Sequence, residues 1–199
     1  MALDINGEKS EVGSAVVKPK DWTLFMLRLS SLLATAAATI VMALNNQTKT
    51  LVVATVGSTP ITATLTAKFQ HNPAFVFFVI ANGMASLHNL LMIALDFFRH
   101  KFNDKGLFLV MIPILDMLNV ALASAGDGAA AFMAELGKNG NSHARWNKIC
   151  DKFGTYCDHG GGALIASFIG LGLLLVVSVL SIIKLLANQK PTNYHVTLP

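Results

Sequence analysis

The chain has 199 residues, of which 53% are hydrophobic and only 13% are charged, and its mean hydropathy is +0.55. This composition is typical of a membrane protein and speaks against an ordinary soluble domain. The net charge of +4 and the pI near 9.2 fit attraction to anionic lipid headgroups, so we expect no nucleic-acid partner.

Four apolar segments are long enough to cross a bilayer, which takes about 20 mainly apolar residues. We expect spans at about 22–44, 74–97, 107–134 and 162–186. The predicted fold class is therefore an all-α membrane protein, with a four-helix domain over 22–186 and tails at 1–21 and 187–199. So little chain remains outside the spans that we expect no enzyme and no cofactor.

An even number of spans places both tails on one side of the membrane. Lysines and arginines lie slightly more often on the tail side, which favours cytosolic tails. The chain's two cysteines, Cys150 and Cys157, fall in the loop after the third span, and that loop would then face an oxidising compartment. No signal peptide is recognised, and the first span can serve as an uncleaved anchor.

The first and third spans carry opposite charges, Arg28 and Asp116. A charge in hydrocarbon costs at least about 2.5–3.5 kcal/mol and usually has a partner. Counted at about 1.5 Å per residue from the tail side, the two depths differ by roughly one turn, which predicts an ion pair. The alternative for Arg28 is to extend separately to the headgroups. His88, Asn89 and Asn119 lie at similar depth and complete a predicted polar layer.

The loop from Asn45 to Asn72 contains two β-branched runs, TKTLVVATV and ITATLTA, on either side of a Gly-Ser-Thr-Pro turn. This pattern predicts a small β-hairpin in the first outer loop, with an irregular loop as the alternative. Asn46-Gln47-Thr48 matches the glycosylation sequon, so Asn46 is a candidate modification site.

Small residues recur at four-residue steps in the first and last spans: Ser31, Thr35, Thr39 and Ala43, then Gly162, Ala166 and Gly170. Such steps allow helices to approach closely, either inside one bundle or between copies of the chain. In the second span, Asn82, Asn89 and Asp96 recur every seven residues and predict one polar face.

A bridge between Cys150 and Cys157 would close a loop of about eight residues and contribute roughly 2.5 kcal/mol in the chain-entropy model. Free thiols, or a zinc site with His143 and His159, are the alternatives, although the spacing fits no standard zinc motif. The sequence offers no Ser/His/Asp set, no paired catalytic carboxylates and no phosphate-binding loop. We therefore predict no metal site.

Three features of the chain resemble the Casparian strip membrane domain proteins and their CASP-like relatives of land plants. They are the outer-loop sequence GNSHARWNKICDKFGTYC, the segment NPAFVFFVIAN entering the second span, and the Arg and Asp in spans one and three. The resemblance implies a MARVEL-like four-helix protein of the plasma membrane. The family's intramembrane charges would correspond to Arg28 and Asp116, and its loop cysteines to Cys150 and Cys157. Strip-forming members carry an acidic and aromatic first outer loop, whereas here that loop is rich in Thr and Val, which favours a CASP-like relative.

The leading functional hypothesis is a non-enzymatic scaffold that self-associates and positions extracellular partners. Its expected partners are membrane lipids, further copies of the chain and related family members. The alternative is a small channel or transporter that uses the polar layer near Arg28, His88 and Asp116. A claudin is disfavoured, because its Trp and Cys signature lies in the first outer loop, whereas Trp146 and both cysteines lie here in the last.

Overall fold

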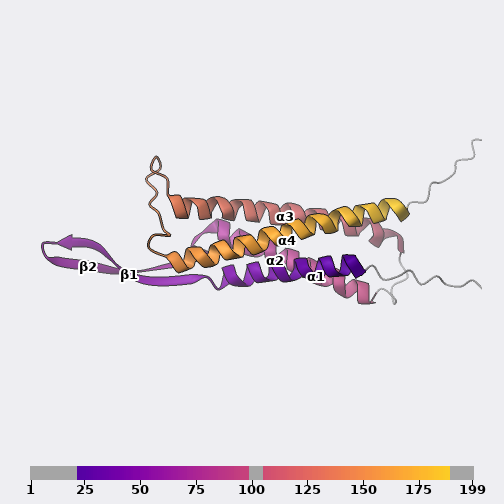
Figure 1. The fold of residues 1–199 in the computed structure, drawn as a ribbon, viewed down its shortest axis with the longest axis horizontal. Coiled ribbons are helices and arrows are strands. Elements are labelled where there is room, and N and C mark those ends of the chain that lie inside the picture. The colour runs from indigo at the N-terminus through magenta and orange to yellow at the C-terminus, as the bar shows by residue number, and fades with distance from the viewer. Residues whose placement is uncertain (1–21, 99–104, 189–199) are drawn as a thin grey trace, which may run out of the picture.

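The computed structural model describes residues 22–98 and 105–188. Its elements in chain order are α1 (Trp22–Ala43), β1 (Asn46–Val56), β2 (Thr59–Lys68), a short 3-10 helix η1 (Phe69–His71), α2 (Pro73–Phe98), α3 (Lys105–Asn139) and α4 (Gly154–Asn188), as Figure 1 shows. Four helices are long and apolar enough to cross a membrane, so the predicted fold class is confirmed. The predicted tails, apart from the last residues of α4, and the connection at 99–104 lie outside the described residues.

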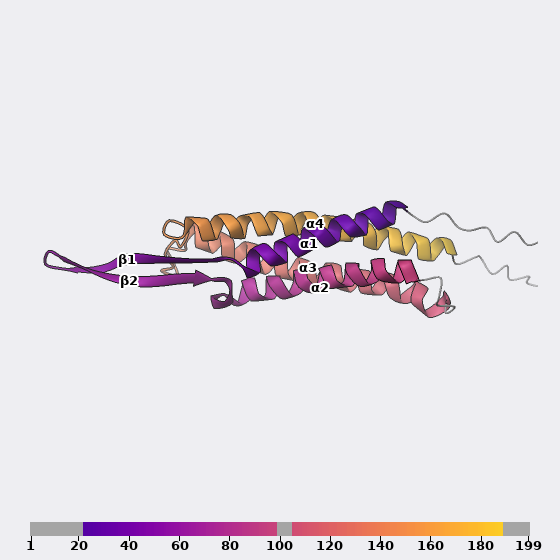
Figure 2. The same ribbon diagram turned by 90° about the horizontal axis from the view of Figure 1, so that it is seen from below.

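The four helices form an elongated bundle in which each helix has two close neighbours. α1 packs against α2 and α4, and α3 also packs against α2 and α4, so α1 and α3 lie on one diagonal of the bundle. The first residues of α1 and the last of α4 lie at one end, and the hairpin lies at the other (Figures 1 and 2). Any interaction between α1 and α3 must therefore pass through the centre of the bundle.

The longer helices extend beyond the predicted spans. α4 begins at Gly154, about two turns before the expected position. Cys157 and the run Gly160–Gly162, which lie before or at the predicted start of this span, are therefore helical. α3 continues to Asn139 and ends where Gly140 adopts a positive φ of 69°, a conformation that glycine adopts without steric cost.

The predicted hairpin is confirmed. β1 and β2 pair antiparallel from Asn46 opposite Lys68 to Val56 opposite Thr59, with one irregularity between Val52 and Ala54. Gly57 has a positive φ of 64°, as a tight turn between two strands requires. The hairpin extends past the helix ends as a separate ribbon (Figures 1 and 2), and most of its side chains are exposed.

Apolar packing is concentrated at the hairpin end of the bundle. This cluster draws residues from every helix: Ala38, Met42, Phe75, Phe78, Ala130, Phe153, Tyr156, Ala163 and Leu164. A smaller cluster of Ala85, Ala123 and Leu174 lies elsewhere in the bundle. Because few large side chains are buried, small residues bring the helices into contact.

The small residues of α1 and α4 face each other inside the protomer. A Cβ added at Gly170 would lie 2.8 Å from Thr35 Cγ2, and Ser31 Oγ donates to the Gly170 carbonyl at 3.3 Å. Of the two interpretations of these steps, packing within one bundle therefore holds at Thr35 and Gly170. Any contact between copies must use other surfaces.

Candidate functional site

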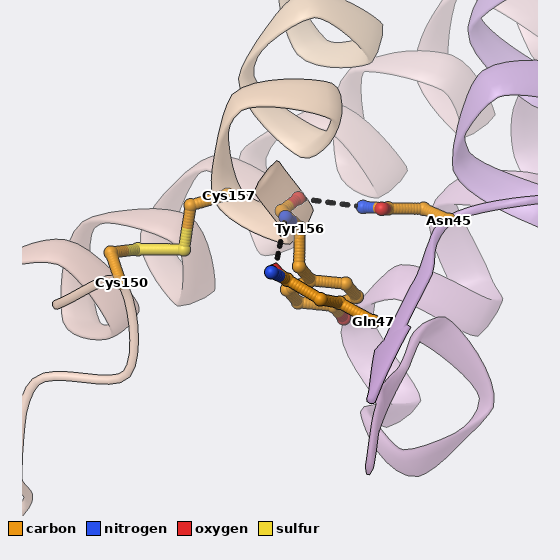
Figure 3. Close-up of a disulfide and its surroundings, with 5 residues drawn as sticks. All are labelled: Asn45, Gln47, Cys150, Tyr156 and Cys157. Carbon is orange, nitrogen blue, oxygen red and sulfur yellow. Dashed lines mark hydrogen bonds between the residues drawn. A yellow bond between two sulfur atoms is a disulfide. The ribbon is translucent and has the colours of Figure 1, made fainter. Parts of the chain in front are cut away.

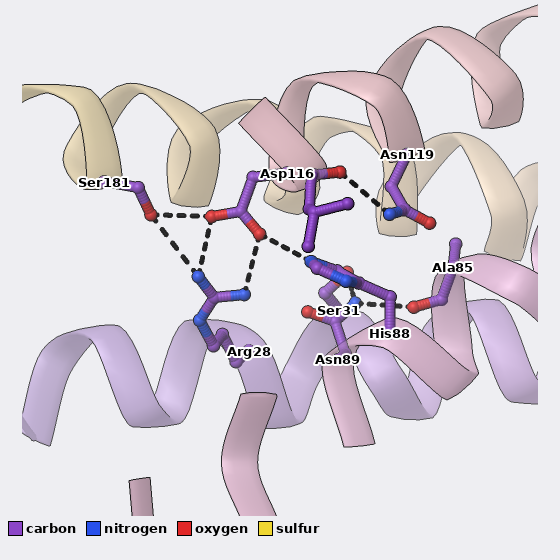
Figure 4. A network of polar contacts seen from close by, with 9 residues as sticks. Arg28, Ser31, Ala85, His88, Asn89, Asp116, Asn119 and Ser181 are labelled. Atoms are coloured by element: carbon purple, nitrogen blue, oxygen red, sulfur yellow. Dashed lines mark hydrogen bonds and ion pairs between the residues drawn. The ribbon is translucent and has the colours of Figure 1, made fainter. Parts of the chain in front are cut away.

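Arg28 and Asp116 meet across the diagonal of the bundle. The two guanidinium nitrogens Nη1 and Nη2 donate to Asp116 Oδ1 and Oδ2 at 3.0 and 2.7 Å, and each residue is only 1% exposed (Figure 4). This is the two-pronged geometry that a planar guanidinium makes with a carboxylate. Arg28 is thus held by Asp116 and does not extend separately to a headgroup.

Two further helices contribute to the same carboxylate. His88 Nε2 of α2 lies 2.7 Å from Asp116 Oδ1, and Ser181 Oγ of α4 donates to Asp116 Oδ2 at 2.7 Å. Because an ionised carboxylate only accepts hydrogen bonds, His88 Nε2 is the donor in this contact. Arg28, His88 and Ser181 come from α1, α2 and α4, so one side chain on α3 connects all four helices. We call these four residues the Asp116 site.

The remaining residues of the predicted polar layer behave differently from one another. Asn89 is buried and donates to Ser31 Oγ at 3.4 Å and to the Ala85 carbonyl at 3.1 Å, which extends the network to α1 (Figure 4). Asn119 instead donates to the Leu115 carbonyl of its own helix at 2.8 Å. Its predicted place in the layer is therefore wrong, because the side chain turns back along α3.

A second polar cluster, which the sequence prediction missed, lies nearer the hairpin end. Asp127 of α3 is 0% exposed, and its Oδ1 accepts hydrogen bonds from Asn82 of α2 at 3.1 Å and Ser167 of α4 at 2.5 Å. We call these three residues the Asp127 site. Counted from His88 and Asp116 toward the hairpin, Asn82 lies about 9 Å along α2 and Asp127 about 16 Å along α3, so the depth count did not pair them.

The predicted polar face of α2 is formed only in part. Asn82 and Asn89 are buried and contribute to the two sites, whereas Asp96 is exposed. The seven-residue spacing thus identified the inward face correctly for two of its three members. Near its tail-side end the helix no longer buries this face.

At the hairpin end, α4 anchors both outer elements. Cys150 and Cys157 are joined by a disulfide (Figure 3). Both cysteines are consumed by this bond, which removes the thiolates that a zinc site with His143 and His159 would need. Across residues 22–98 and 105–188, no group of three or more His, Cys, Asp or Glu side chains gathers as metal ligands.

The base of the hairpin is fixed to the same turn of α4. Asn45 Nδ2 donates to the Tyr156 carbonyl at 2.8 Å, and the Tyr156 amide donates to Gln47 Oε1 at 2.9 Å (Figure 3). The Tyr156 ring also packs edge-on against Phe75 of α2, at 6.3 Å between centroids. Asn46, between the two anchoring residues, is exposed and donates to the Leu44 carbonyl. Its glycosylation stays a prediction.

Comparison with known proteins gives a consistent result. The model of the Casparian strip membrane protein domain matches residues 18–173. CASP-like protein 1B2 of Populus trichocarpa is 70% identical over 97% of this chain and 98% of its own length. CASP-like protein 1B1 of Ricinus communis is 66% identical over 100% of both chains, and CASP-like protein 1B2 of Arabidopsis thaliana is 63% identical over 89% and 90%. No solved structure matches. With four candidate spans and this domain over most of its length, the chain belongs to the Casparian strip membrane protein domain family.

Proposed function

We propose that the chain is a non-enzymatic scaffold of the plasma membrane that self-associates and organises a membrane subdomain. Its tails lie in the cytosol, and its hairpin and disulfide loop face extracellular or cell-wall partners. The observation that carries this proposal is the contrast between a bundle connected through one buried carboxylate and a hairpin that extends beyond it with exposed side chains. A bundle whose four helices are joined at one carboxylate, with an exposed hairpin that extends from it, suits a protein that holds a partner in place.

The hairpin supports the partner-binding half of the proposal. Val52, Val53 and Val56 are exposed at its outer part. Within residues 22–98 and 105–188 the sheet has two strands, so the outer edge of each strand is unpaired there. Exposed β-branched side chains and free backbone edges are features that other chains can pair with. Asn45 and Gln47 hold the base of the hairpin on Tyr156, so the direction of the hairpin is coupled to the membrane domain.

The outer face of α3 is where we place the contact between copies. Ser124 and Gly128 are exposed and four residues apart, and a Cβ added at Gly128 would meet no atom within 4 Å. In a bilayer, small residues on an outward face let the backbones of two helices approach each other. Gly126, two residues earlier, faces inward against Ala81 and belongs to the bundle itself.

The transporter alternative has weaker support. The residues that suggested it, Arg28, His88 and Asp116, are engaged with one another and with Ser181. Ion flux through purified protein in liposomes separates the two functions, because a scaffold gives no flux above that of protein-free vesicles. The same bonding supports the non-enzymatic part of the proposal, since these ionisable groups serve to join helices.

The test of the scaffold is lateral mobility in the plant plasma membrane, followed by fluorescence recovery after photobleaching of a tagged chain. The parent should recover slowly, and Gly128→Leu should recover faster because the added side chain separates the α3 faces. Gly172→Leu is the matched control, because Gly172 on α4 is also exposed with no atom within 4 Å of an added Cβ.

Equal slow recovery of all three proteins would place the contact away from α3. A parent that diffuses freely in the membrane and is monomeric in mild detergent would contradict self-association altogether. Native mass spectrometry of the affinity-captured complex then reports which other proteins it holds.

A further inference from the structure

The Asp127 site contains more hydrogen-bond acceptors than its hydrogens can serve. Asn82 Nδ2 has two hydrogens, and its two partners are the Phe78 carbonyl at 3.2 Å and Asp127 Oδ1 at 3.1 Å. Ser167 Oγ lies 2.7 Å from Asn82 Oδ1 and 2.5 Å from Asp127 Oδ1. A hydroxyl has one hydrogen, so it can donate to only one of these two oxygens.

With an ionised Asp127, one of the two short contacts of Ser167 would place oxygen against oxygen with no hydrogen between them. Turning the Asn82 amide over does not solve this, because its oxygen would then face the Phe78 carbonyl oxygen. One additional hydrogen on Asp127 Oδ1 resolves the arrangement. Asp127 then donates to Ser167, Ser167 donates to Asn82, and Asn82 donates to the carbonyl of Phe78.

The charges around the site give an independent argument. Among the described residues Asp127 has no cationic partner, and its Oδ2 is buried without any hydrogen-bond partner. The site borders the apolar cluster that includes Ala38 of α1, Phe78 of α2 and Leu164 of α4. An ionised carboxylate in such surroundings pays a large desolvation cost with no counter-charge, and a protonated carboxyl avoids that cost.

In the part of the chain that the structure describes, no ionisable group on the four packed helices lies close enough to offset the desolvation cost of an ionised Asp127. The charged residue that α1 contributes to the bundle centre is Arg28, and it is bonded to Asp116. On α2 the nearest titratable group is His88, which also contacts Asp116. On α4 the nearest are Asp158 and His159, both exposed and more than two turns from Ser167. On α3 itself they are Asp116 and Glu135, at about three and two turns, and both are acids.

We infer that Asp127 is a proton-binding site inside the membrane bundle: its carboxyl holds a proton on Oδ1 at neutral pH and donates it to Ser167. The bound proton joins α2, α3 and α4 through one chain of hydrogen bonds. Because the folded bundle then binds a proton that the unfolded chain releases at neutral pH, stability falls as the pH rises. Removal of the proton leaves a buried, uncompensated charge between three helices.

Infrared spectroscopy of the full-length protein in lipid, labelled with ¹³C at the aspartate carboxyl, tests the inference directly. At neutral pH the parent should show one carbonyl band of a protonated carboxylic acid that shifts in D₂O. The ¹³C band should be absent from Asp127→Asn, and in Asp127→Glu it should be replaced by an unlabelled carboxylic-acid band at the higher ¹²C frequency. It should disappear from the parent when the pH is raised far enough to unfold the bundle. The label makes the parent spectrum informative whatever the yield of the variants.

Three results would overturn the inference. One is a parent spectrum without a protonated carboxyl band at neutral pH. Another is a band that survives in Asp127→Asn, which would assign it to a different acid. The third is a band that appears only after sodium is replaced by choline, which would show that a metal cation, and not a proton, occupies the site.

Discussion

Asp116 and Asp127 lie on the same helix, and both are almost completely buried, yet their surroundings differ in charge. Asp116 receives a guanidinium, an imidazole and a hydroxyl from the other three helices. Asp127 receives only an amide and a hydroxyl, from α2 and α4. The first carboxylate has a full cation beside it, and the second has none among the described residues.

The difference shows two ways of placing an acid inside a membrane bundle. A charged acid needs an opposite charge at bonding distance, and the pair is then hard to separate because each partner would be left uncompensated. A neutral acid needs only hydrogen-bond partners and can be replaced by a neutral amide of similar shape. The same substitution should therefore have different consequences at the two sites.

The largest effect is expected from removing one member of the ion pair. Arg28→Ala or Asp116→Ala leaves the other charge buried alone and should cost about 3–5 kcal/mol of the free energy of unfolding. The measurement is unfolding by SDS titration in mixed micelles. The exchange Arg28→Asp with Asp116→Arg should recover part of the loss, and an alanine variant as stable as the parent would disprove the importance of the pair.

The contribution of the disulfide to the free energy of unfolding should be independent of the Asp116 and Asp127 sites. Replacing Cys150 and Cys157 by Ser should cost about 2.5 kcal/mol in the chain-entropy model. Combined with Asp116→Ala, the losses should add within about 0.3–0.5 kcal/mol, since the sites share no partner. Peptide mapping without reduction should recover the linked fragment, and two alkylatable thiols in protein from the plasma membrane would contradict the bond.

A smaller effect is expected where α3 approaches α2 beside Asp127. A Cβ at Gly126 would lie 2.8 Å from Ala81 Cβ and 3.4 Å from Phe78 Cα, so Gly126→Ala should cost about 1–3 kcal/mol through overpacking. Gly172→Ala is the matched control, since no atom lies within 4 Å of its added Cβ and Gly172 lies outside the proposed contact between copies. Equal midpoints for the two variants in the same SDS titration would mean that the close α2–α3 contact does not position the Asp127 site.

Much of the architecture could be predicted because a bilayer requires long apolar segments and penalises unpaired charges, and both can be recognised in a sequence. Apolar length identified four spans, β-branched runs around Gly57 identified the hairpin, and the cost of buried charge led from Arg28 to Asp116. Ser181 could not be predicted in the same way, because a serine in a span gives no signal of its partner.

The remaining misses concern helix rotation and helix ends. Depth can be counted along a sequence, but the direction of Asn119, or the inward position of Gly126 against the outward position of Gly128, depends on how each helix is turned in the bundle. The early start of α4 was missed because glycines, an aspartate and a histidine near Cys157 are typical of a loop. In the structure, contacts with Asn45 and Gln47 hold that segment in helical form.

On this account, Asp116 is a charged, paired acid and Asp127 a neutral one. The most direct test compares the free energies of unfolding of Asp116→Asn and Asp127→Asn in one detergent at neutral pH. Asp116→Asn removes the counter-charge of Arg28 and should lose about 3–5 kcal/mol. Asp127→Asn replaces a neutral acid by a neutral amide that can still donate to Ser167 but can no longer accept from Asn82. It should therefore lose only about 1–2 kcal/mol. Equal losses, or a larger loss at Asp127, would contradict the account.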